Sequence, residues 1–282
     1  MKTVHTISEM KSLCREIVRS GSTLGLVPTM GALHEGHLSL VRAGKSQCHA
    51  TAVSIFVNPL QFGPNEDYAK YPRTLERDAS LLLELGVDIL FAPSAVEMYP
   101  AGAATHVEVE ALSSRLDGGS RPGHFRGVAT VVAKLFEIVR PDYAFFGQKD
   151  AAQVAVLRKM VRDLNMDVQL IVCPIVRESD GLALSSRNVY LSADQRKQAL
   201  VLHRSLVRVT SAVESGENDA ARLIDIGKRT IAEEPAARLD YFAVVTPDTL
   251  EPINDVSQGA LVAVAAFFGA TRLIDNLLLP GR

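Results

Sequence analysis

The sequence predicts an α/β fold, with a Rossmann-like parallel sheet that carries helices on both faces and a smaller α+β domain after it. Two observations favour this class. Short runs rich in branched and aromatic residues alternate with helical apolar spacing up to about residue 176, which is typical of parallel strands joined by helical crossovers. The chain then becomes polar and turn-rich, and the pattern changes. We therefore divide it into domains at 1–176 and 177–282.

The first part contains five expected strands, at 23–27, 51–57, 87–92, 143–147 and 167–172. Between them, apolar residues recur every three or four positions over 75–85, 128–139 and 154–164, which predicts helices. Ligands of such sheets bind beyond the carboxyl ends of the strands. Since the polar segments 28–37, 58–62 and 147–153 each follow a strand, we expect them to meet in one crevice.

The second part begins with the polar, turn-rich segment 177–192. Helical spacing then predicts one long helix over 193–214 and another over 221–234. Two apolar stretches, 239–245 and 259–279, read as strands. This order of elements predicts the smaller α+β domain.

The composition excludes several classes of protein. The chain has 282 residues, 47% of them hydrophobic and 22% charged, with a formal charge of −2 and a pI near 6.4, so we expect no nucleic-acid or membrane partner. The longest apolar run, 260–270, is too short to span a bilayer. Three scattered cysteines and an N-terminus without a signal-peptide pattern indicate a cytoplasmic protein.

The segment "PTMGALHEGH" (28–37) places His34 and His37 between a strand and a helical pattern. Zinc sites of the HExxH type space their histidines by four residues on a helix, whereas here the spacing is three and Gly36 intervenes. A second interpretation is that one histidine is partly buried and the other exposed, without a functional role. A glycine-containing loop that enters a helix instead offers free N–H groups and a positive dipole to an anion. We therefore favour phosphate binding.

Other segments carry polar groups at strand ends. Gln61 follows an Asn-Pro turn and either is a simple turn residue or holds a small polar substrate. Asp78 either favours the first turn of a helix or helps to hold Mg²⁺. The glycine-rich loop at 119–126, with Arg121, His124 and Arg126, is equally compatible with a solvated surface and with an anion site.

The segment "FGQKD" (146–150) is more informative. Lys149 lies where a helix begins, an electrostatically unfavourable place that a bound triphosphate would compensate. Asp150 either caps the helix or accepts a ribose hydroxyl, and Gln153 lies one turn further on. In "DGLALSSRN" (180–188), Ser185, Ser186 and Arg187 are either part of a polar linker or donors in a loop that closes on phosphates.

The H-x-G-H element resembles the nucleotidylyl-transferase superfamily. The segments "PTMGALHEGH", "FVNPLQF", "YPRT", "GHFRGVATVV", "FGQKD" and "RESDGLALSSRN" also occur in the order and approximate spacing of the pantoate–β-alanine ligase family. This resemblance implies an AMP-forming ligase that makes a C–N bond. ATP, used as a substrate with Mg²⁺, adenylates pantoate, and β-alanine then displaces AMP to give pantothenate. It also implies a homodimer and a C-terminal domain that acts as a lid.

The resemblance implies roles for residues at matching positions. The catalytic groups are His34, His37, Lys149, Ser185, Ser186 and Arg187. ATP is bound by these residues together with Met30, Gly147, Asp150, Val176 and Leu184, of which Gly147 and Asp150 contact ribose and Val176 and Leu184 flank adenine. Gln61, Gln153 and Met30 bind pantoate, and Asp78 is matched to Mg²⁺.

One departure from the family pattern lies beside these residues. The family has an aromatic residue and a glutamine directly after Lys-Asp, whereas this chain reads "KDAAQ" with Ala151 and Ala152. Because Gln153 is retained, we expect activity. The alternatives are another H-x-G-H nucleotidylyltransferase, a zinc hydrolase that uses "HEGH", and a non-catalytic relative that senses nucleotides.

Overall fold

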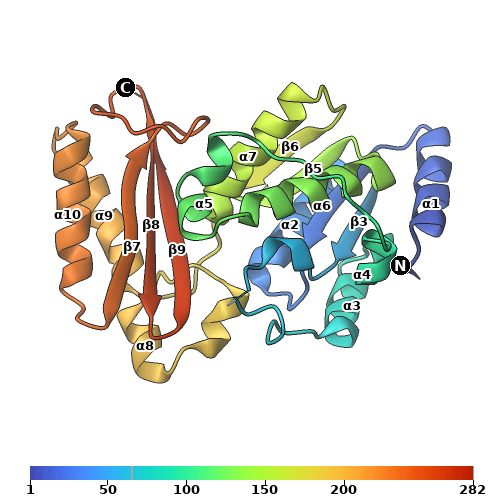
Figure 1. The fold of residues 1–282 in the computed structure, drawn as a ribbon, viewed down its shortest axis with the longest axis horizontal. Helices are drawn as coiled ribbons and strands as arrows, with labels where there is room; N and C mark the ends of the chain where they lie inside the picture. Colours follow the sequence, from blue (N-terminus) through green and yellow to red (C-terminus); the bar gives the residue numbers. More distant parts are fainter. Residues whose placement is uncertain (65, 282) are drawn as a thin grey trace.

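A computed structural model describes residues 1–64 and 66–281 and contains two sheets (Figure 1). The larger sheet has six parallel strands in the order β1-β4-β3-β2-β5-β6. Its strands are β1 (Lys2–Val4), β2 (Leu24–Thr29), β3 (Ala50–Ile55), β4 (Ile89–Phe91), β5 (Tyr143–Gly147) and β6 (Gln169–Cys173). The parallel sheet is confirmed. Strand β1 was not expected, because three residues are too short to show a pattern.

Helices cover both faces of this sheet, as predicted. The helices on one face are α1 (Ile7–Arg19), α6 (His124–Val139) and α7 (Ala151–Asp163), and those on the other are α2 (Glu35–Gln47) and α3 (Leu75–Glu84). Alternate strand residues divide between two cores: Phe146 of β5 packs with α6 and α7, whereas Phe145 packs with α2. Short helices complete this part: η1 (Pro59–Gln61), α4 (Ala95–Met98), η2 (Leu112–Ser114), α5 (Asp117–Ser120) and η3 (Gln148–Asp150).

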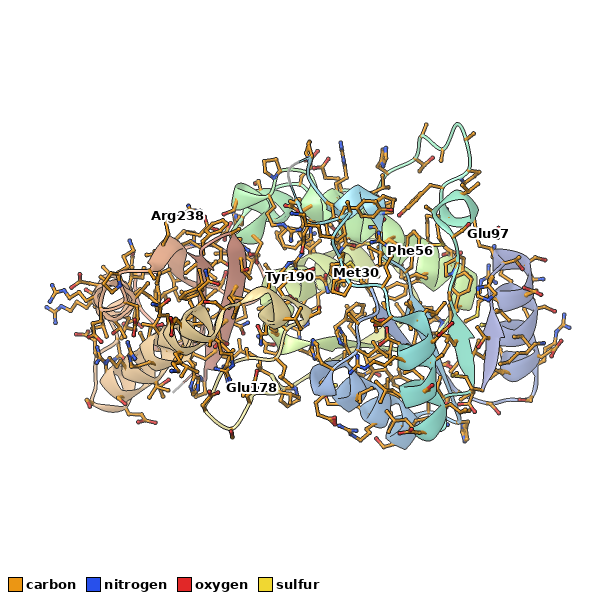
Figure 2. All side chains as sticks on the ribbon, turned by 90° about the horizontal axis from the view of Figure 1, so that it is seen from below. Met30, Phe56, Glu97, Glu178, Tyr190 and Arg238 are labelled. Carbon is orange, nitrogen blue, oxygen red and sulfur yellow. The ribbon has the colours of Figure 1, made fainter. Side chains whose placement is uncertain are left out.

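The C-terminal part is built on an antiparallel sheet in the order β7-β8-β9. Its strands are β7 (Ala237–Val245), β8 (Ala260–Phe268) and β9 (Thr271–Leu279), and its helices are η4 (Ser186–Tyr190), α8 (Ala193–Gln198), α9 (Val201–Glu214) and α10 (Ala220–Ala232). Helices α9 and α10 pack on one face of the sheet and share a separate core with it. Figure 2 shows the side chains of both parts of the chain.

The prediction of one long helix over 193–214 is wrong. Between α8 and α9 the α-helical bonding pattern is interrupted by tighter turns of the 3₁₀ type. Leu200 N donates to Lys197 O and Leu202 N donates to Ala199 O, so that both bonds span three residues. Apolar periodicity continues across this turn because Ala199 and Leu202 are both buried in the same core.

The strand order defines where the loops meet. Strands β2 and β5 are neighbours, and the chain builds the sheet outward from them in opposite directions. The loops after their carboxyl ends, which carry His34 and Lys149, therefore border the switch point at which such sheets bind ligands. Strand β9 is the edge of the smaller sheet that lies toward this point (Figure 1). No helix in the described part of the chain is long and apolar enough to cross a membrane.

Candidate active site

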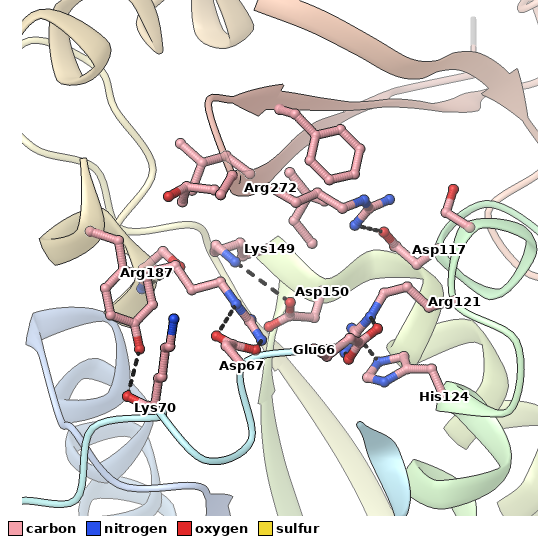
Figure 3. A pocket seen from close by; sticks show the side chains of 18 of the residues that line it. Glu66, Asp67, Lys70, Asp117, Arg121, His124, Lys149, Asp150, Arg187 and Arg272 are labelled. Atoms are coloured by element: carbon pink, nitrogen blue, oxygen red, sulfur yellow. Dashed lines mark hydrogen bonds and ion pairs between the residues drawn. The ribbon is translucent and has the colours of Figure 1, made fainter. Parts of the chain in front are cut away.

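A cavity of about 840 Å³ lies between the two parts of the chain (Figure 3). Predicted site residues from distant segments line it, namely Lys149, Asp150, Gln153, Ser185 and Arg187. The opposite wall comes from residues 270–274 at the start of β9. The cavity thus brings the "FGQKD" and "SSR" segments together.

His34 and His37 form the N-terminal cap of α2. The Nδ1 atom of His34 accepts a hydrogen bond from Gly36 N at 3.2 Å, and Nδ1 of His37 accepts one from His34 N at 3.4 Å. The ring centroids are 4.1 Å apart. Since each Nδ1 accepts, each neutral ring carries its proton on Nε2. Neither Nε2 has a hydrogen-bond partner among the described residues, so both donors are available to a ligand.

The electrostatic surroundings keep both histidines neutral. Burial, and after it the Lys149 ammonium, lowers the pKa of His34 to about 4. Burial and the neighbouring His34 lower the pKa of His37 to about 3. Near pH 7 the pair therefore acts through neutral N–H donors. The pairing of β2 with β5 brings the loops that follow these two strands close together.

Lys149 and Asp150 occupy the turn between β5 and α7. Lys149 Nζ lies 3.6 Å from Asp150 Oδ1, and the Lys149 side chain is 22% exposed. Burial raises the pKa of Asp150, but Lys149 and His37 outweigh this and hold it below the ordinary value. Asp150 is the N-cap residue of α7, but its side chain makes no capping hydrogen bond. The two alanines that follow, Ala151 and Ala152, are buried in the main core rather than lining the cavity.

Gln61 lies against Met30 at the β2 side of the site. Its Nε2 approaches Met30 Sδ at 3.2 Å, and its Oε1 accepts from Asn58 Nδ2 at 3.0 Å. Tyr99 in turn donates to Asn58 Oδ1 at 2.9 Å. Gln61 is buried, and this chain of bonds fixes its amide. Packing fixes its backbone, because a Cβ on Gly127 of α6 would lie 2.2 Å from Leu60 O.

Asp78 does not face the cavity, contrary to the prediction for a Mg²⁺ ligand. Its side chain is 0% exposed. Its Oδ2 accepts from Ala32 N at 2.8 Å and from Thr74 Oγ1 at 3.1 Å, while Oδ1 accepts from Leu33 N at 3.0 Å. Both oxygens are therefore used to hold the loop that leads into His34. Thr74 precedes α3, but its hydroxyl bonds Asp78 instead of capping the helix.

In the loop at 119–126, the side chains of Arg121 and His124 already have hydrogen-bond partners. Arg121 donates to both carboxylate oxygens of Glu66, at 2.7 and 2.6 Å. His124 Nδ1 donates to Gln61 O at 2.7 Å, and its other nitrogen accepts from Arg121. Arg126 is exposed and does not line the cavity. Arg121 therefore positions the Gln61 segment and is already neutralised by an acid, which weakens the interpretation of this loop as an anion site.

The segment 180–188, which we call the serine loop, is connected to the parallel-sheet part of the chain by side chains that the sequence did not mark as functional. Arg187 donates to both oxygens of Asp67, at 3.1 and 3.0 Å (Figure 3). Tyr71 and Ser186 hydroxyls lie 3.1 Å apart. Tyr71 opens the "YPRT" segment, but no local signal gives its role or marks Asp67, because their partners are more than a hundred residues away. Tyr190, labelled in Figure 2, adds a bond to Lys70 O at 3.2 Å.

Some predicted site residues are not among those that line the cavity. Ser186 belongs to this group because its hydroxyl is paired with Tyr71. Val176 and Leu184 are half-buried and joined by a backbone bond of 3.0 Å from Leu184 N. The other predicted residues that do not line the cavity are Met30, His34, His37, Gln61 and Gly147. Within residues 1–64 and 66–281, no group of three His, Cys, Asp or Glu side chains could hold a metal ion.

Comparisons with known proteins agree with this arrangement. The family model described as pantoate-beta-alanine ligase matches residues 2–278. A relative from Koribacter versatilis (strain Ellin345), named pantothenate synthetase, is 62% identical over 279 residues, covering 99% of this chain and 96% of its own. Another, from Pelotomaculum thermopropionicum (strain DSM 13744 / JCM 10971 / SI), has the same name and is 55% identical over 279 residues, with 99% of each chain covered.

Solved structures give the same result. The crystal structure of pantothenate synthetase from Thermus thermophilus superposes with a TM-score of 0.94 at 50% identity, covering 98% of this chain and 99% of that one. Pantoate-beta-alanine ligase from Francisella tularensis, complexed with beta-gamma ATP and beta-alanine, has a TM-score of 0.80 at 35% identity, covering 99% and 97%. The chain therefore belongs to the pantoate–β-alanine ligase family, as its motifs predicted, and its activity is the condensation of pantoate with β-alanine in pantothenate biosynthesis.

Proposed function

We propose that the cavity is where ATP adenylates pantoate and where β-alanine then attacks the adenylate. The observation that supports this most is the convergence of Lys149, Asp150 and Arg187 on one cavity beside two neutral histidines. In the first step a pantoate carboxylate oxygen attacks the α-phosphorus, and the bond to pyrophosphate breaks. In the second step the amine attacks the acyl carbon, AMP leaves, and the nitrogen loses a proton.

The ATP subsite follows from the donors that surround the cavity. The Nε2–H groups of His34 and His37 donate to phosphate oxygens, and their neutrality lets them follow developing charge without a change of protonation. Lys149 bridges the phosphates and the attacking carboxylate. Ser185, Ser186 and Arg187 hold the departing pyrophosphate. Gly147 and Asp150 contact ribose, and Val176 and Leu184 flank adenine.

The pantoate subsite lies where Gln61 meets Met30. The amide of Gln61 is oriented by Asn58, which leaves it pre-organised to bind hydroxyl and carboxylate oxygens. Gln153 lines the cavity from α7 and is the second amide proposed to bind pantoate. Met30 supplies an apolar wall for the gem-dimethyl group.

Mg²⁺ is proposed as the metal that accompanies ATP. Among the described cavity residues, each carboxylate already faces a cation: Glu66 faces Arg121, Asp67 faces Arg187, Asp117 faces Arg272 and Asp150 faces Lys149. The phosphates therefore supply most of the ligands for the ion, as is usual for Mg²⁺.

The smaller domain, 177–282, is proposed to act as a lid over the site formed by 1–176. Hydrogen bonds and ion pairs connect its serine loop to the larger part, among them Arg187–Asp67 and Tyr71–Ser186. Such polar contacts can exchange for contacts with phosphates and water. The family resemblance supports a homodimer, and three free cysteines in the described residues fit a cytoplasmic protein.

The test is release of pyrophosphate and AMP from ATP, Mg²⁺ and pantoate, with and without β-alanine. Pyrophosphate that depends on pantoate, followed by AMP that depends on β-alanine, supports the two-step reaction. Bound ATP without pantoate-dependent release would instead support the sensing relative. Lys149→Ala should slow adenylate formation by about a hundredfold or more, the cost of losing a key electrostatic donor.

A further inference from the structure

Strand β9 sends one buried side chain into the turn that carries Lys149. Asn276 is only 3% exposed. Its Nδ2 donates to Gln148 O at 3.0 Å and to Lys149 O at 2.9 Å, and its Oδ1 accepts from Gln148 Nε2 at 3.0 Å. One amide from the C-terminal sheet thus holds two consecutive backbone carbonyls, one in each of the peptide groups that flank Lys149.

The hydrogen bonds from Asn276 matter because few other contacts hold the side chain of Lys149 in place. The ammonium group of Lys149 has a single ion-pair partner in the described chain, Asp150 at 3.6 Å, which is longer than a good hydrogen bond. The direction of the side chain therefore depends on where its backbone lies. The two bonds that Asn276 donates join this backbone to a strand about 128 residues away in sequence.

The neighbouring residue, Asp275, fixes β9 itself. Its carboxylate accepts from Arg177 Nη1 at 2.6 Å and Nη2 at 2.9 Å, and it is buried. Arg177 also donates to Gly181 O at 3.0 Å, at the base of the segment that leads to Ser185. Consecutive strand residues point to opposite faces. Asp275 and Asn276 therefore connect one strand to the serine loop on one side and to the lysine turn on the other.

We propose that Asn276 is a positioning residue for adenylation, which acts by holding the Lys149 turn against β9. This inference rests on the role proposed for Lys149. It predicts that Asn276 affects the chemical step through Lys149 rather than through overall stability.

A double-mutant cycle on pantoate-dependent ATP–pyrophosphate exchange tests the proposal. Asn276→Ala should lower kcat by about tenfold to a hundredfold, the scale expected when a reacting group is misplaced by about an ångström, with the KM for ATP little changed. In the Lys149→Ala background the same substitution should have almost no further effect, because the group that it positions is gone. Asn254→Ala, in an exposed loop of the same domain, is the matched control.

The possible outcomes distinguish the positioning role of Asn276 from the role proposed for Lys149. Equal losses from Asn276→Ala in both backgrounds, or no loss in either, would overturn the positioning role while leaving that of Lys149 intact. Near-normal exchange by Lys149→Ala alone would overturn the role of the lysine and this inference with it.

Asn276→Asp preserves the shape of the side chain and so covers the case in which the alanine variant fails to fold. The new carboxylate faces two carbonyl oxygens, and protonation restores one donor. Its rate relative to the parent protein should therefore rise as the pH falls, whereas that of Asn276→Ala stays flat. A flat ratio for Asn276→Asp would refute direct bonding to the two carbonyls.

Discussion

Replacing Asp78 by alanine tests whether this carboxylate holds the loop before His34 or binds the metal. Asp78 is fully buried and accepts three hydrogen bonds, two of them from the backbone N–H groups of Ala32 and Leu33. The third comes from the hydroxyl of Thr74. Alanine leaves these three donors without their acceptor in a site closed to water.

The expected cost follows from these contacts. Each buried donor left unsatisfied costs about 1–3 kcal/mol. Two backbone donors that cannot move far give a loss of about 3–5 kcal/mol in the free energy of unfolding, allowing for partial relaxation, which is among the larger effects of single substitutions. Because Ala32 and Leu33 lead directly into the cap of α2, the KM for ATP should rise as well.

The assay is urea unfolding together with adenylation rates measured over a range of Mg²⁺ concentrations. Glu76→Ala, which removes an exposed acid in the same first turn of α3, should change stability little and serves as the control. If Asp78→Ala unfolds with nearly the parental free energy, the Asp78 carboxylate does not hold the loop before His34. A normal stability combined with a large increase in the Mg²⁺ concentration needed for activity would restore the metal-ligand prediction.

Three further predictions concern the histidine pair and the packing of α6 against the segment that carries Gln61. His34 and His37 have lowered pKa values of about 4 and about 3, so adenylation should show no imidazole-type loss as the pH falls from 8 to about 5.5. The unfolded chain binds these protons near pH 6.5 and the folded chain does not, so unfolding should become easier as the pH falls from about 6.5 toward 4, measured by urea midpoints. A pH–rate profile with an acid limb near 6.5 that disappears in His37→Gln would contradict neutral histidines. Gly127→Ala places a Cβ 2.2 Å from Leu60 O and should raise the KM for pantoate at least about tenfold, whereas Gly63→Ala, whose Cβ meets only ordinary contacts at 3.7 Å, should not. Equal steady-state KM values for the two variants would show that α6 does not support the substrate amide.

The sequence by itself determined the layout of the large domain. Runs of branched and aromatic residues located β2, β3, β4, β5 and β6 to within a few residues, and the rule for parallel sheets places His34 and Lys149 at one edge of the sheet. Strands and strand-to-helix loops could be predicted because their signals are local. Periodicity failed where burial continued through a change of backbone, as between α8 and α9, and where an element was only three residues long, as in β1.

Only the tertiary structure decided which hydrogen-bond and ion-pair partners the polar residues have. Asp78 looked like a metal ligand until its oxygens were found to hold a loop that lies 45 and 46 residues away. Arg121 and Arg187 looked like free cations, but Glu66 and Asp67 neutralise them from 55 and 120 residues away. Asn276 carries no motif at all. A hydrogen bond forms only within about 3 Å, and which distant groups come that close depends on the packing of the whole chain rather than on the residues beside them.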